Sequence, residues 1–115
     1  MRYLSIFQPA KPVSGPPSEE NMAAMMKLIK DMTLSGELVL TGGIGKRETA
    51  GFTVTRKGDR FDVQAPPDTA WMRAGGFAIL EARDRAHAIE QAKRFMQTGE
   101  DGTCEMIEIS MPPPM

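Results

Sequence analysis

The fold is decided by one stretch, residues 75–95, which runs GGFAILEARDRAHAIEQAKRF. Two glycines open a short apolar run, a pattern that predicts a central strand over 75–81. Asp84 follows, and its carboxylate can accept a hydrogen bond from an unpaired amide, so it predicts a helix N-cap. Beyond it the apolar residues recur at helical spacing, at Ala88, Ile89, Ala92, Phe95 and Met96. The stretch therefore predicts a strand followed by an amphipathic helix that ends near residues 98–99.

An earlier stretch repeats this strand and helix order. Residues 2–8 are rich in aromatic and β-branched side chains and too few for a helix, so they predict a strand. Ser18 predicts the N-cap of a helix over 18–35, and Gly36 predicts its end. Its apolar face is predicted to carry Met22, Met25, Met26, Ile29 and Met32. Methionines at this spacing favour a core role, and an adaptable binding surface is the alternative.

Shorter strands complete the pattern. Residues 38–41 predict one, 103–110 predict the last, and 52–56 with 60–64 predict a hairpin around Lys57-Gly58-Asp59. In the hairpin, the alternating apolar residues are predicted to point into the core: Phe52, Val54, Phe61 and Val63.

The order of elements predicts an α+β fold, a ferredoxin-like βαββαβ pattern with an extra hairpin strand. Right-handed crossovers place both helices on one sheet face. The other face is then open in a single chain, and we predict that it carries Tyr3, Ser5, Phe7, Cys104 and Met106. A second copy is the simplest cover for so apolar a face, which predicts a homodimer with a cavity between its two sheets.

The composition narrows the function. A chain of 115 residues predicts a single domain, 1–115, and its Pro-rich end predicts a flexible tail at 111–115. One cysteine and one histidine argue against a disulfide, a metal site and, as we expect, any cofactor. A net charge of −1 without a basic run argues against nucleic acid as a partner. No apolar stretch approaches the roughly 20 residues of a membrane span, and no secretory signal is recognisable, so we expect no membrane partner and a cytoplasmic location.

Three segments resemble one family across almost the whole chain. They are RYLSIF, PSEENMAAMMKLIKDMTLSGEL and the GGFAILEARDRAHAIEQAKRF stretch, which resemble the YCII-related proteins of the DGPF branch. The resemblance implies a dimeric ferredoxin-like α+β barrel of mostly unassigned function. Members are often encoded beside, or fused to, extracytoplasmic-function sigma factors, which implies a transcription regulator as a possible partner.

The resemblance also shows where this chain departs from its relatives. The tetrapeptide that names the branch falls on Gln64-Ala65-Pro66-Pro67, where only Pro66 agrees. The acidic residue that members carry a few positions later falls on Thr69, and Asp68 is the nearest carboxylate. Acid-base chemistry through a His–Asp pair is proposed for some members. The sole histidine, His87, lies in the first turn of the second predicted helix, so that pair does not transfer.

The loop after the hairpin is the best site candidate. Asp68, Trp71 and Arg73 place a carboxylate, a large aromatic ring and a guanidinium between two strands, which can orient a small polar ligand. Stapling of the loop to a partner chain is an equal alternative for Trp71. Lys46, Arg47 and Arg60 either add positive charge to such a site or merely solvate the surface. The predicted ligand-binding residues are Phe7, Gln64, Pro66, Asp68, Trp71 and Arg73.

Two other functions stay open. In the first, a small lyase, isomerase or hydrolase uses Asp68 or Asp62 as its base, and Arg73 stabilises a developing anion. In the second, the chain is an interaction module that acts with a transcription regulator. His87 is predicted to be an exposed helix residue that touches its own cap, and Cys104 a buried strand residue, because Asp101 and Glu105 beside it disfavour a reactive thiolate.

Overall fold

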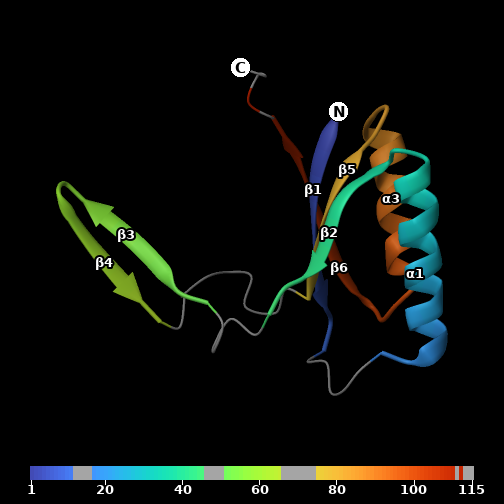
Figure 1. Cartoon of the computed structure of the whole chain (residues 1–115), viewed down its shortest axis with the longest axis horizontal. Helices are drawn as coiled ribbons and strands as arrows, with labels where there is room; N and C mark the ends of the chain where they lie inside the picture. Colours follow the sequence, from blue (N-terminus) through green and yellow to red (C-terminus); the bar gives the residue numbers. More distant parts are fainter. Residues whose placement is uncertain (12–16, 46–50, 66–74, 111, 113–115) are drawn as a thin grey trace.

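The computed structural model describes residues 1–11, 17–45, 51–65, 75–110 and 112. A four-stranded sheet carries two helices on one face, and a two-stranded hairpin projects away from this body (Figure 1). In chain order the elements are β1 (Arg2–Pro9), α1 (Glu19–Leu34), β2 (Leu38–Gly43), β3 (Thr53–Lys57), β4 (Arg60–Gln64), β5 (Gly76–Glu81), α3 (Arg85–Met96) and β6 (Gly102–Ile109).

The four strands of the main sheet follow the order β2-β5-β1-β6. Every neighbouring pair is antiparallel, and β1 pairs along its length with both β5 and β6. Each helix follows one strand of the sheet and returns the chain to another, with one strand left between the two. This mixed α+β arrangement is confirmed and is compatible with a ferredoxin-like fold, and β5 is central as predicted.

Both helices begin where their capping residues predict. The Ser18 hydroxyl accepts a hydrogen bond from the Asn21 amide at 3.1 Å, and the Asp84 carboxylate accepts one from the His87 amide at 2.8 Å. Each bond satisfies an amide that the first helical turn leaves without a backbone partner. Neither helix in the described part of the chain is long and apolar enough to span a membrane.

The core lies between the two helices and one face of the sheet. Met32 of α1 and Leu80 of β5 are fully buried in it, together with Leu38 and Ala78. A second buried cluster joins Tyr3, Ala82 and Ala88 at the start of α3. Met26, by contrast, is exposed, so the apolar face of α1 is narrower than its methionine pattern predicts.

The helices cover the sheet face that was predicted to be open. The residues expected on the open face point instead toward the helices, where Tyr3 packs against Ala88 and the others contact the helices or line a pocket: Ser5, Phe7, Cys104 and Met106. Strand alternation fixes which residues share a face, but the helices decide which face they cover. The face without a described helix carries Leu4, Ile6, Leu40, Phe77, Ile79 and Ile107, of which only Ile6 is buried.

The hairpin prediction is confirmed in its secondary structure and wrong in its burial. Gly58 turns the chain with a φ of 62°, a backbone conformation that favours glycine. The apolar side chains do not reach a core, because β3 pairs with β4 alone and joins no other described strand. Their exposed fractions are 67% for Phe52, 54% for Val54, 63% for Phe61 and 69% for Val63.

Candidate functional site

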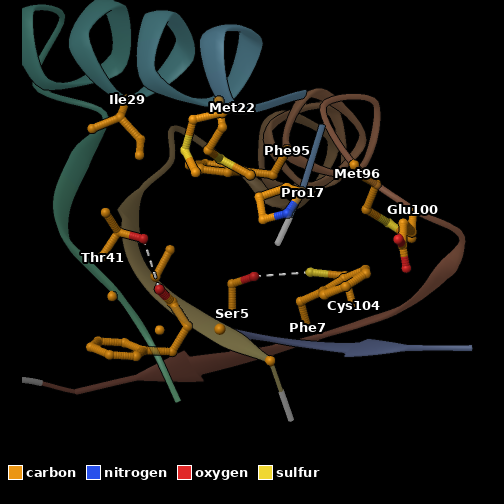
Figure 2. Close-up of a pocket in the computed structure, with 18 residues that line it drawn as sticks. Ser5, Phe7, Pro17, Met22, Ile29, Thr41, Phe95, Met96, Glu100 and Cys104 are labelled. Carbon is orange, nitrogen blue, oxygen red and sulfur yellow. Dashed lines mark hydrogen bonds between the residues drawn. The ribbon is translucent and has the colours of Figure 1, made fainter. Parts of the chain in front are cut away.

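A pocket of about 530 Å³ lies between the helices and the sheet (Figure 2). Its floor comes from β1, β2, β5 and β6, and its roof comes from α1 and α3. Volumes of about 300–1,000 Å³ are typical of small-molecule sites. The residues that define its character are Ser5, Phe7, Thr41, Cys104, Met22, Met25, Ile29, Phe95 and Met96.

The floor holds the polar side chains of the pocket. Ser5 and Cys104 lie on adjacent strands, and the Ser5 hydroxyl oxygen is 2.9 Å from the Cys104 sulfur (Figure 2). The Thr41 hydroxyl donates to the Phe77 carbonyl at 2.9 Å. Each of these groups thus has an internal partner, and the oxygens of Ser5 and Thr41 keep lone pairs that can accept from a ligand.

The roof is apolar and rich in sulfur. Met22 and Ile29 descend from α1, while Phe95 and Met96 come from α3 (Figure 2). Met25 of α1 also lines the pocket. Unbranched, polarizable thioether side chains adapt their shape to a ligand at little cost. The sequence left open whether these methionines were core or binding surface. Met32 belongs to the core, whereas Met22 and Met25 line the pocket.

Gly102 makes room for one wall of the pocket. A Cβ at this position would lie 2.7 Å from the edge of the Phe7 ring and would meet the Gln8 carbonyl oxygen. Atoms at that separation overlap, and the backbone oxygen cannot yield as a flexible side chain would. Glycine in β6 therefore allows the Phe7 ring to lie flat against the strand at the pocket wall.

A smaller, mainly apolar cavity of about 190 Å³ adjoins the pocket and brings further polar side chains to its rim. The two share Phe7, Pro17, Met22, Met25, Gly99 and Glu100, and the smaller one adds Pro9, Asn21 and Thr98. Glu100 is the single charged residue on the linings of these two cavities in the described part of the chain. The site is thus an apolar chamber with polar groups on its floor and rim.

A polar cluster lies apart from the pocket, where α3 begins and β2 approaches. The Glu37 carboxylate accepts hydrogen bonds from Gln91 at 3.1 Å and Ser35 at 2.8 Å, and it lies 3.2 Å from His87 Nε2 and 3.5 Å from Arg94. The Gln91 hydrogen bond is the largest cause of the lowered pKa of Glu37; the Ser35 and His87 bonds and the Arg94 charge add to it, while burial opposes it. The cluster ties α3 to the start of β2.

His87 is held at both ring nitrogens. The Arg83 amide donates to Nδ1 at 3.0 Å, so in the neutral ring the hydrogen is on Nε2 and points to Glu37. The prediction of an exposed histidine is wrong for the side chain, which is only 19% exposed, although its amide does bind the Asp84 cap. Since both nitrogens are engaged and the residue is not on a pocket lining, His87 acts here as a structural link.

The predicted site residues fall in three places. Phe7 lines the pocket. Gln64 and Asp62 lie on the hairpin, both exposed, and Asp62 is 3.5 Å from the Arg60 guanidinium. The remaining predictions fall outside the described residues: Lys46, Arg47, Pro66, Asp68, Trp71 and Arg73. The described part of the chain thus brings none of the predicted polar groups to the pocket.

Sequence reasoning missed the polar floor. Cys104, predicted to be a buried strand residue, is partly exposed and contributes its thiol to the pocket wall. Strand alternation places Ser5 and Phe7 on the same face of the sheet. The prediction put that face opposite the helices, so their place in the pocket was missed. Glu37 carried no local signal, since its partners His87 and Gln91 lie some 50 residues away. Within the described ranges, no group of three or more His, Cys, Asp or Glu is placed to hold a metal ion.

The fold and the pocket define a small α+β protein whose cavity lies between a helical layer and an antiparallel sheet. The sequence model of the YCII-related domain matches residues 1–111, and the chain belongs to the YCII-related family. No curated protein matches the chain.

Proposed function

We propose that this YCII-related protein binds a small, mainly apolar molecule in the pocket between α1, α3 and the sheet. The observation that carries the proposal is the pocket itself: about 530 Å³ walled by methionine, isoleucine and phenylalanine, with hydroxyl and thiol groups gathered on its floor. Pockets that combine an apolar wall with a few oriented polar groups are the usual form of small-molecule sites. The chemistry supports a flat or branched hydrocarbon body with one hydrogen-bonding group.

This proposal changes both the place and the character of the expected ligand. A polar molecule between two sheets was expected near Asp68, Trp71 and Arg73, which lie outside the described residues. The polar atoms of the described pocket floor are neutral hydroxyl and thiol groups. Neutral groups on the floor favour an uncharged ligand group there, and the Glu100 carboxylate on the rim disfavours an anion.

The finer assignments of the sequence stay as proposals. Membership of the DGPF branch and a link to a transcription regulator rest on the resemblance, and a cytoplasmic location rests on the sequence pattern. An enzyme with an Asp base gains little support from the described residues, since Asp62 lies exposed on the hairpin and does not line the pocket. Ligand binding is the function that the pocket favours.

The test uses indole as a probe, because its flat apolar ring carries a single N–H donor. With 13C-labelled methionine methyl groups, indole is expected to shift the signals of Met22, Met25 and Met96 and to leave that of Met26 in place. No shift at the pocket methionines, or equal shifts at Met26, would contradict the proposal.

A matched pair of variants locates the binding. Met25→Trp fills the pocket and is expected to weaken indole binding at least ~10-fold, because the new ring occupies the space that the ligand needs. Met26→Trp places the same side chain one residue further along α1, on the exposed side, and is expected to leave the affinity unchanged. Equal affinities of the two variants would place the indole elsewhere.

A further inference from the structure

Glu100 stands where the pocket and the smaller cavity meet. Its side chain lines both of them, as does the Phe7 ring, and it is exposed at the rim. In Figure 2, Glu100 lies at one end of the pocket and Thr41 lies at the other. A molecule that fills the pocket can therefore place one end against a neutral hydroxyl and the other end against a carboxylate.

The backbone is anchored on both sides of Glu100. On one side, the buried Thr98 hydroxyl lies 3.6 Å from the Met25 sulfur of α1. On the other side, the Asp101 carbonyl accepts a hydrogen bond from the Ala10 amide at 3.0 Å. The segment is thus tied both to α1 and to the chain that leaves β1, and these contacts keep the carboxylate at the rim of the pocket.

The charge of Glu100 is not neutralised by the part of the chain that the structure describes. Within those ranges, no lysine, arginine or histidine lines either cavity, and no ion pair includes Glu100. The nearest basic residues along α3 are engaged elsewhere, since Lys93 lies 3.4 Å from Glu90 and Arg94 lies 3.5 Å from Glu37. The carboxylate is therefore available to a cation from outside the chain.

The two helix ends at the rim also favour a cation over an anion. α3 ends at Met96, four residues before Glu100, and the C-terminus of a helix carries partial negative charge. α1 begins at this rim, where Asn21 lines the smaller cavity, and the N-terminus of a helix attracts anions. Its first turn carries Glu19 and Glu20, so that attraction is already balanced within the chain.

We propose that the ligand of this pocket is an apolar primary amine, whose protonated amino group binds Glu100 while its hydrocarbon body fills the pocket. The inference rests on the proposed function and adds to it the chemical class of the ligand. A protonated amine donates three hydrogen bonds and accepts none, which suits a carboxylate that lacks a cationic partner. The Phe7 ring adds an aromatic surface, and such surfaces attract cations.

Three probes with one ring and similar arms isolate the charge of the arm. Tryptamine, tryptophol and indole-3-acetate all carry the indole ring, and their arms end in an ammonium, a hydroxyl and a carboxylate group. Titration of the methyl signals of Met22 and Met25 measures the affinity of each probe for the pocket. Tryptamine is expected to bind roughly 5-fold more tightly than tryptophol, the upper range for an ion pair at an exposed site. Indole-3-acetate is expected to bind more weakly than either.

Variants of Glu100 and of its neighbour locate the cation. Glu100→Gln is expected to bring the ratio of the tryptamine and tryptophol affinities close to one, and Glu100→Lys is expected to make indole-3-acetate the tighter ligand. Asp101→Asn is the matched control, because it removes an acidic charge one residue away from a side chain that lines neither cavity. This control is expected to keep the preference for tryptamine.

The outcomes separate this inference from the proposed function. If indole binds at the pocket methionines but tryptamine binds no more tightly than tryptophol, the amine is overturned and the pocket remains a binding site. A preference for tryptamine that survives in Glu100→Gln, or that falls equally in Asp101→Asn, would overturn Glu100 as the group that binds the amine. If none of the indole compounds shifts the pocket methionines, both proposals fail.

Discussion

Strands β5 and β4 are both short and both carry apolar side chains, yet they lie in opposite environments. β5 has a neighbour on each side and α1 above it, and its Leu80 is fully buried. β4 has one neighbour, and every one of its residues is exposed. Local pattern determines that both form strands, whereas burial depends on what packs against them. The body of the chain is therefore held by its own core, whereas the hairpin pairs with no described strand outside its own two.

The largest predicted difference in stability comes from shortening one apolar side chain in each of the two strands. Leu80→Ala removes a fully buried side chain from β5 and is expected to cost about 3 kcal/mol, because the rigid surroundings leave a cavity. Val63→Ala on β4 is expected to cost under ~0.5 kcal/mol, because this side chain is 69% exposed. Urea denaturation measures both. Similar costs would mean that the hairpin packs against its own body.

The next effect concerns the pocket wall. Gly102→Ala is expected to cost about 2 kcal/mol and to weaken indole binding, because its methyl group overlaps the Phe7 ring and the Gln8 carbonyl oxygen. Gly99→Ala is the control for the stability cost, since its added carbon meets no atom within 4 Å. Thermal unfolding and the indole titration give the two values. An unaffected Gly102→Ala protein would show that the Phe7 ring is free to move aside.

The polar cluster around Glu37 predicts that the stability of the fold depends on pH. The lowered pKa of Glu37, caused first by its Gln91 hydrogen bond, means that the ionised carboxylate stabilises the folded chain. This contribution is complete above the unfolded pKa of about 4.3 and is lost as the pH falls through the lower folded value. Glu37→Gln is therefore expected to cost about 1.5 kcal/mol at neutral pH and progressively less in acid.

Denaturation at a series of pH values checks this dependence. Glu90→Gln serves as the control, because among the described residues the exposed Glu90 pairs with the exposed Lys93, and its loss is expected to change stability by less than ~0.5 kcal/mol. A Glu37→Gln cost that stays constant down to acid pH would rule out the carboxylate as its source.

The smallest predicted effect on stability comes from replacing one glycine of positive φ in the body and one in the hairpin. Gly36 and Gly58 have φ values of 81° and 62°, and an added Cβ at either would meet no atom within 4 Å. Gly36→Ala is expected to lower the global stability by about 1 kcal/mol, because alanine is strained in this conformation. Gly58→Ala carries the same strain but is expected to leave global unfolding unchanged and to speed amide exchange in the hairpin alone. Equal global losses would couple the hairpin to the core.

The features predicted correctly from the sequence are those that depend on residues close together along the chain. The Ser18 and Asp84 caps, the Gly58 turn and the order of helices and strands along the chain all follow from local chemistry, and each is present. Strand alternation does not predict which sheet face the helices cover, because it is compatible with either face. That choice depends on how the whole chain packs. For that reason Ser5 and Cys104 were grouped correctly but placed on the wrong face, and of the predicted site residues only Phe7 has a described place in the pocket.

The two edge strands of the sheet, β6 and β2, differ in how strongly they disfavour pairing with a strand of another molecule. β6 carries Glu105 and Glu108, and acidic side chains on an edge oppose pairing with a strand from another molecule. β2, at the other edge, contains no charged residue, and its Val39 and Leu40 are exposed. In concentrated solution, β2 is therefore the edge along which misassembly would start, and a lysine at Val39 is the change that would improve solubility.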